Sequence, residues 1–137
     1  MVMKKTEAIN KFRTEIEATM VESFRSVLES EGRIQYQIYL WEDGQIERLE
    51  GTYGDRSYLR PRDDEERQLF YICRVDWGYM GEAGITDIDE MVEDYEADVE
   101  EILDYVYLEA VDEERWDWWS CWSLLWCTCV YLCWLRL

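Results

Sequence analysis

The chain has 137 residues, which is enough for one domain around one hydrophobic core. Its formal net charge of −18 excludes binding to nucleic acid or anionic lipid through a general basic surface, and it favours basic partners. Histidine is absent, which excludes the catalytic pairs and metal sites that need an imidazole.

Residues 6–30 are predicted to form an amphipathic helix. Apolar residues recur there every three or four positions, as they do on one face of a helix. Gly32 follows as a C-terminal stop signal. The apolar positions are Ile9, Phe12, Ile16, Met20, Phe24 and Leu28.

A β-hairpin is predicted over residues 33–50. Side chains alternate strictly from Arg33 to Trp41, which is typical of a strand, and Asp43-Gly44 supplies a tight turn before the returning strand at 45–50. Tyr39 and Trp41 lie on the strand face opposite Ile38 and Leu40. As exposed aromatics near a turn they are candidate partner anchors. Under a second layer they would instead be core side chains, and the sequence leaves both interpretations open.

A loop is predicted over 51–68 and a third strand over 69–77. Phe70 and Ile72 face opposite to Leu69, Tyr71, Cys73 and Val75, so the strand is apolar on both faces, which is usual for a central or covered strand. The order helix, three strands, helix predicts an α+β fold, with a three-stranded antiparallel sheet covered by helices on one face. Residues 1–115 are expected to form this single α-βββ-α domain.

The segment 87–117 holds fifteen of the thirty-two acids and a single base, Arg115. Apolar residues return in it every three or four positions, so it is predicted to be a long helix with one apolar stripe, capped at its start by Thr86. The predicted stripe is Ile88, Met91, Val92, Tyr95, Val99, Ile102, Leu103 and Val106. The acids predicted to point outward, and the candidate partner-binding residues, are Glu90, Glu93, Asp94, Glu100, Glu101 and Asp104.

The charge density of this helix can be compared with that of nucleic acid. Residues 87–110 carry eleven acids over about 36 Å of helix, or one per roughly 3.3 Å. One strand of a duplex carries one phosphate per about 3.4 Å. The helix is therefore a candidate to occupy a groove lined with Lys and Arg. Two other interpretations stay open: a solvated helix face, and an acidic surface that serves solubility in high salt.

The segment 116–137 differs abruptly in composition, with six of the eight tryptophans and four of the five cysteines. Three explanations compete. The first is a C-terminal membrane anchor, since eighteen uncharged residues span roughly 27 Å as a helix. The second is a packed or oligomer-forming segment. The third is that the segment is not native sequence, because a frameshift or misplaced stop codon produces runs rich in Trp, Cys, Leu and Val. Contact with a membrane is expected only through this tail.

The sequence predicts no enzyme, metal or cofactor. Cys121, Cys127, Cys129 and Cys133 lack the paired C-x2-C spacing of zinc sites, and no phosphate loop or nucleophile elbow is present. The start of the chain carries no signal peptide, so the protein is expected in the cytoplasm with reduced cysteines.

Two functions follow as expectations. In size, charge and element order, with the hairpin turn 41–44 followed by an acidic helix, the chain resembles phage-encoded anti-restriction and anti-CRISPR inhibitors. The resemblance lies in these general features and in no sequence motif, so it assigns no role to any single residue. It implies a non-enzymatic nucleic-acid mimic that binds the basic groove of a nuclease or DNA-binding complex, without binding nucleic acid itself. The alternative is an interaction or scaffold protein, tail-anchored or oligomeric through residues 118–135.

Overall fold

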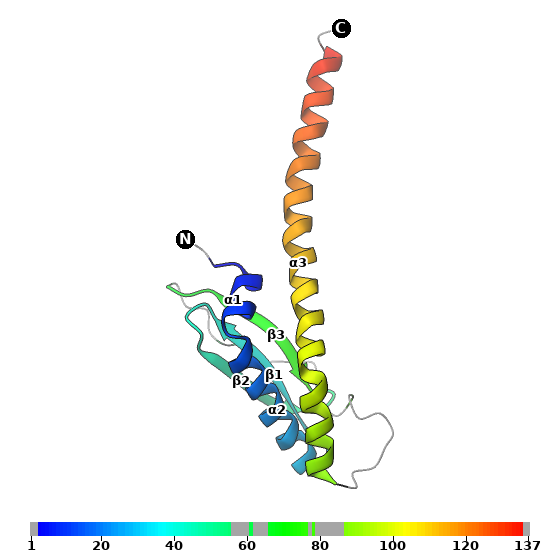
Figure 1. The fold of residues 1–137 in the computed structure, drawn as a ribbon. Helices are drawn as coiled ribbons and strands as arrows, with labels where there is room; N and C mark the ends of the chain where they lie inside the picture. The colour runs from blue at the N-terminus through cyan, green and yellow to red at the C-terminus, as the bar shows by residue number, and fades with distance from the viewer. Residues whose placement is uncertain (1–2, 56–60, 62–65, 77, 79–86, 136–137) are drawn as a thin grey trace.

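The structure is a computed structural model that describes residues 3–55, 61, 66–76, 78 and 87–135, of which 116–135 are described as backbone only. In chain order the elements are two helices, three strands and one long helix, which confirms the predicted α+β fold (Figure 1).

The predicted first helix is divided into α1, Lys5–Lys11, and α2, Arg13–Glu29. The backbone departs from helical angles at Phe12, with φ −113° and ψ 23°. The division places the ring of Phe12 against Gly44, where a Cβ atom would lie only 2.4 Å from Cε1 of that ring. This packing places the start of α2 against the hairpin turn. The spacing of apolar residues could not predict it, because Gly44 lies far from Phe12 in the chain.

The end of α2 is a Schellman motif. The N–H of Gly32 donates to the carbonyl of Val27, and the N–H of Glu31 donates to the carbonyl of Leu28, each at 3.0 Å. Both Glu31 and Gly32 have positive φ. The predicted stop at Gly32 is therefore confirmed, with Glu31 sharing the left-handed conformation.

The predicted hairpin is confirmed. Strand β1, Ile34–Trp41, pairs antiparallel with β2, Ile46–Thr52, across the turn that contains Gly44 at φ +98°. Strand β3, Leu69–Val75, pairs antiparallel with the other edge of β1, so the sheet order is β2-β1-β3. Trp77, the expected end of β3, lies outside the described residues.

Strand β3 contains a β-bulge that changes the predicted facing of its side chains. Ile38 pairs with Cys73 but Tyr39 pairs with Tyr71, which leaves Ile72 as an extra residue. The bulge places Phe70, Ile72, Cys73 and Val75 together in the core cluster, while Tyr71 is exposed. The expected grouping of Cys73 and Val75 with Leu69 and Tyr71 is therefore wrong, because strict alternation holds only in a strand without a bulge.

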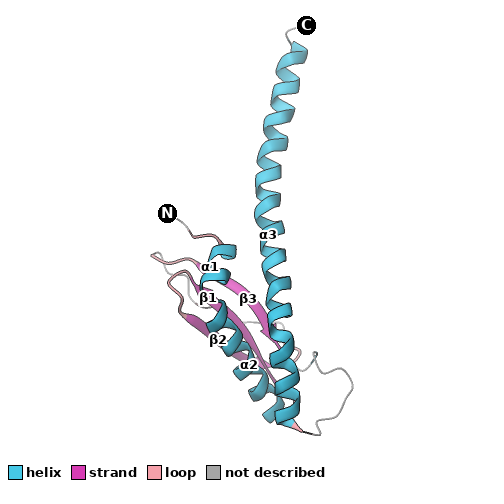
Figure 2. Cartoon of the chain, viewed as in Figure 1, coloured by secondary structure: helices cyan, strands magenta, loops and turns pink. Residues whose placement is uncertain are grey.

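The three helices lie on one face of the sheet, and one hydrophobic cluster joins them to it (Figure 2). Helix α3, Ile88–Leu135, packs along α2 and then continues beyond the rest of the fold (Figure 1). The hydroxyl of Thr6 in α1 donates to the carboxylate of Glu114, close to where α3 leaves the body. The tail from residue 116 to 135 thus extends α3 as a helical backbone.

Candidate functional site

The acidic helix α3 begins at an N-cap formed by Asp87. One carboxylate oxygen of Asp87 accepts the N–H groups of Asp89 at 3.0 Å and Glu90 at 3.4 Å. The carbonyl of Asp87 accepts the N–H of Met91, which is the first helical hydrogen bond. The predicted cap, Thr86, lies outside the described residues. A carboxylate at this position also interacts favourably with the positive end of the helix dipole.

The buried face of α3 fixes how the helix is rotated on the body. Tyr95 stacks on Phe24 of α2 with ring centroids 4.2 Å apart, and both side chains are buried. Val99 and Leu103 continue the same stripe. Of the predicted stripe, Ile88, Met91 and Ile102 are only partly buried and pack at its edge, while Ala110 is an additional core residue. Because this stripe is anchored, the opposite face of α3 points to solvent.

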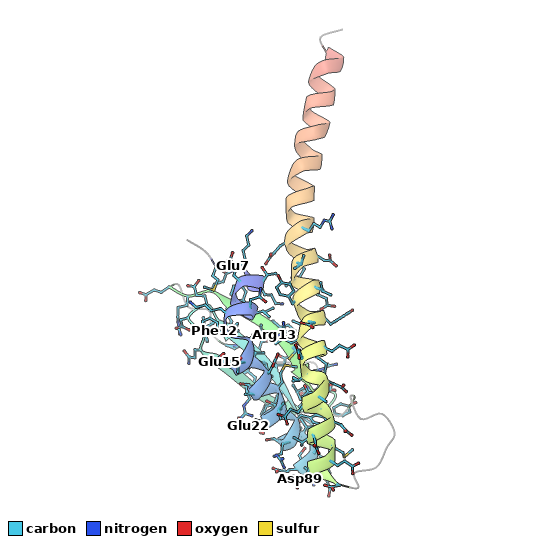
Figure 3. The ribbon with its side chains drawn as sticks, in the orientation of Figure 1. Glu7, Phe12, Arg13, Glu15, Glu22 and Asp89 are labelled. Carbon is cyan, nitrogen blue, oxygen red and sulfur yellow. The ribbon has the colours of Figure 1, made fainter. Side chains whose placement is uncertain are left out.

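Four acids form what we call the acidic face of α3: Glu90, Glu93, Asp94 and Glu101. They fall within about 100° of the helix circumference, opposite the buried stripe. All four are exposed, and none makes an ion pair among the residues that the structure describes. Figure 3 shows side chains projecting along the free side of α3, away from α2 and the sheet. Within the described part of the chain, no lysine or arginine neutralises the charge of this face.

Glu100 and Asp104, also predicted to face outward, lie on the side of α3 next to α2. Arg13 of α2 forms an ion pair with Asp104 and donates to the carbonyl of Glu100 at 2.9 Å (Figure 3 labels Arg13 between the two helices). Burial alone would lower the pKa of Arg13, but hydrogen bonds to Asp104 and Glu17 raise it above its usual value. Asp104 is therefore a partly neutralised charge. Sequence spacing could not identify this, because Arg13 lies far away in the chain.

A second arginine, Arg25, connects the same two helices near the start of α3. Its guanidinium lies 2.9 Å from the carboxylate of Asp89. Arg13 and Arg25 are twelve residues apart on α2, and their partners Asp104 and Asp89 are fifteen apart on α3, in the reverse order. The two ion pairs therefore bracket the antiparallel contact between α2 and α3.

An open groove of about 760 Å³ lies between α2 and α3. Its apolar lining includes Val21, Val92 and Val99, and four acids also line it: Glu17, Glu22, Glu96 and Glu100. The sequence alone does not indicate this groove, because the groove depends on how two distant helices pack. We call it the interhelical groove.

Tyr39 and Trp41 are buried, with 7% and 2% of their surface exposed, so they belong to the core and cannot anchor a partner from the surface. The hydroxyl of Tyr39 donates to Gln37, and the indole N–H of Trp41 donates to Glu47 at 2.9 Å. The guanidinium of Arg67 lies 4.3 Å from the centre of the Trp41 ring, a favourable cation–π distance. The ring of Tyr71 lies 5.5 Å from that of Tyr39, and Arg67 lies over Trp41, so the interpretation of these aromatics as exposed anchors is wrong.

Within the described residues, no three His, Cys, Asp or Glu side chains gather in a way that could hold a metal ion. A search of the same part of the chain finds no helix with the length and hydropathy needed to cross a membrane. Comparison with protein-family models, with curated proteins and with solved structures gives no match.

Proposed function

We propose that this protein is a non-enzymatic inhibitor that mimics the charge of nucleic acid. Its acidic face would occupy the basic groove of a nuclease or DNA-binding complex, in the manner of anti-restriction and anti-CRISPR proteins. The observation that carries the proposal is the set of exposed acids Glu90, Glu93, Asp94 and Glu101 on one side of α3, which make no ion pair with any described residue. Repelling carboxylates destabilise a helix, so their concentration needs a cause other than folding.

The charge density on α3 supports competition with a phosphate backbone. Residues 88–110 carry ten acids over about 35 Å of helix, or one per roughly 3.5 Å, against about 3.4 Å per phosphate in one strand of a duplex. Asp89 and Asp104 are paired with arginines, and Asp98 also has an interaction partner. The other seven acids still give one charge per roughly 4.9 Å. The acidic face itself carries four of these charges over about 18 Å of helix, or one per roughly 4.5 Å, on the side that a basic groove would meet.

The rigidity of the scaffold also supports the proposal. The N-cap at Asp87, the stacked Phe24 and Tyr95, and the ion pairs of Arg13 and Arg25 hold α3 before any partner arrives. A preorganised surface loses less conformational entropy on binding than a flexible acidic tail does.

The test is inhibition of DNA cleavage by a panel of restriction endonucleases and CRISPR effector complexes. The wild-type chain is expected to inhibit at least one of them. The variant Glu90→Lys/Glu93→Lys/Glu101→Lys should lose inhibition. The matched control Glu7→Lys/Glu15→Lys/Glu29→Lys reverses three exposed acids of α1 and α2, has the same net charge, and should retain it. Equal loss in both variants, or no inhibition by the wild type, would contradict the proposal.

The alternative function is an interaction or scaffold protein that assembles through residues 118–135. The observation that favours it is the projection of α3 beyond the body (Figure 1), together with Tyr105 and Leu108, which are 65% and 58% exposed. Deleting residues 117–137 separates the two functions. The inhibitor should remain active without the tail, whereas a scaffold should lose its assembly, as measured by light scattering.

A further inference from the structure

The interhelical groove combines an apolar lining with a negative rim. Val21 of α2 is partly exposed and Ala97 of α3 is exposed on this lining, whereas Val92 and Val99 of α3 are buried at 5% and 4% exposure. Ala18 and Thr14, also on the lining, are small, which leaves the hollow open. A volume of about 760 Å³ is in the range of sites that hold several side chains or a small ligand.

The charges around the groove are unequal. Four acids line it against one base, Arg25, which is already paired with Asp89. Glu17 is paired with Arg13 at 3.0 Å, and Glu22 lies 3.8 Å from Arg48. Glu96 and the carboxylate of Glu100 are exposed and make no ion pair among the described residues. The side of the groove formed by α3 therefore offers two unneutralised carboxylates next to apolar surface.

We propose that the interhelical groove binds an amphipathic, arginine- or lysine-rich helix of a partner protein. The aliphatic side chains of such a helix would pack on the accessible lining residues Ala18, Val21 and Ala97, while its basic groups would reach Glu96 and Glu100. Helices commonly dock in this way, with residues at every third or fourth position filling an apolar groove. Charge complementarity excludes an acidic peptide, and the apolar lining distinguishes this site from the purely electrostatic acidic face.

This inference goes beyond the proposed inhibition and does not depend on it. The acidic face would provide charge that any phosphate-binding groove recognises, whereas the interhelical groove requires a particular combination of apolar and basic side chains. Interfaces gain specificity when a polar rim surrounds an apolar contact. The two surfaces can therefore be tested with different variants, and the failure of one leaves the other standing.

The probe is a synthetic amphipathic peptide with leucine at every third or fourth position and arginine between. Its binding to the full chain is measured by fluorescence anisotropy and by NMR of valine methyl groups. We expect the methyl signals of Val21 to shift and those of Val75, in the hydrophobic core, to stay. A peptide with serine in place of leucine, of equal charge, should bind at least about tenfold more weakly, because it loses the burial of leucine.

Two groove variants and one matched control complete the test. Glu96→Gln/Glu100→Gln should weaken binding of the leucine–arginine peptide about three- to tenfold, since partly screened charge pairs are modest in strength. Ala18→Leu, which fills the hollow without changing charge, should weaken it comparably. Glu90→Gln/Glu101→Gln changes the net charge equally on the acidic face and should leave binding within about twofold. Equal binding of the serine peptide, or equal weakening by the acidic-face control, overturns the proposal.

Discussion

Replacing Glu93 with glutamine should make the protein more stable, even though Glu93 belongs to the surface proposed to function. Glu93 is exposed on α3 and has acids at three neighbouring helical positions: Asp89 at i−4, Glu90 at i−3 and Glu96 at i+3. Each like-charge pair at this spacing costs about 0.2–0.5 kcal/mol. Glu93→Gln removes three pairs and makes no cavity, so the free energy of unfolding should rise by about 1 kcal/mol, or roughly 4 °C in Tm.

The assay is urea unfolding followed by circular dichroism, because urea is uncharged and does not screen the repulsion. It is performed in about 0.01 M and about 1 M NaCl, where the Debye length is about 30 Å and about 3 Å. The gain from Glu93→Gln should be largest at low salt and nearly vanish at high salt. The matched control is Glu15→Gln on α2, which has no acid at i±3 or i±4 and has Lys11 at i−4. Glu15→Gln should be neutral or slightly destabilising.

Two results would refute this reasoning. If Glu93→Gln lowers stability at low salt, the carboxylate makes a stabilising contact that its exposed position on α3 does not provide. If the gain is the same at both salt concentrations, its cause is helix propensity and not charge. Either outcome would show that repulsion within the acidic face does not lower the free energy of unfolding.

Three further predictions concern the scaffold. Gly44→Ala should lower the free energy of unfolding by about 3 kcal/mol, because φ is +98° and the new methyl group would meet the ring of Phe12. The control Gly54→Ala, at φ +84° with nothing within 4 Å, should lower it by only about 1 kcal/mol. Asp87→Ala should cost about 1 kcal/mol in the same unfolding assay through loss of the N-cap; no change would place the cap elsewhere. Burial raises the pKa of the Cys73 thiol to about 12, so iodoacetamide at pH 8 should label its tryptic peptide only after unfolding in urea, and prompt labelling of the folded chain would contradict this burial.

Local sequence patterns predicted the elements whose structure depends on neighbouring residues. The alternation from residue 33 to 41 and the Asp43-Gly44 turn specify the hairpin, and the apolar stripe of residues 88–106 specifies the buried face of α3. These patterns predict secondary structure because the side-chain periods of strands and helices, about 2 and 3.6 residues, are short compared with the lengths of the segments. The order of elements was then enough for the fold class.

Features that depend on distant contacts could not be predicted in the same way. The division at Phe12 comes from its packing on Gly44, and the bulge at Ile72 changes which β3 side chains reach the core. Tyr39 and Trp41 are buried because β1 is the central strand and Arg67 covers Trp41. The residues of β1 alone do not indicate which segments pack beside or over this strand.

The candidate site was predictable in part for the same reason. Exposure of Glu90, Glu93, Asp94 and Glu101 follows from helical spacing within α3 alone. The pairing of Asp104 with Arg13 joins residues ninety-one positions apart. The interhelical groove arises only when α2 and α3 pack together. The spacing of small residues along α2, at Thr14, Ala18 and Val21, was the one local signal that could have suggested it.

The central claim is that the acidic face of α3 competes with nucleic acid for a protein groove. The most direct measurement is capture of proteins on the immobilised full chain, followed by elution with duplex DNA and, separately, with polyglutamate at equal charge concentration. We expect duplex DNA to release the captured proteins at lower concentration than polyglutamate, and we expect the Glu90→Lys/Glu93→Lys/Glu101→Lys variant to capture none of them. Captured proteins that keep their hold on the chain while also binding duplex DNA would contradict the claim.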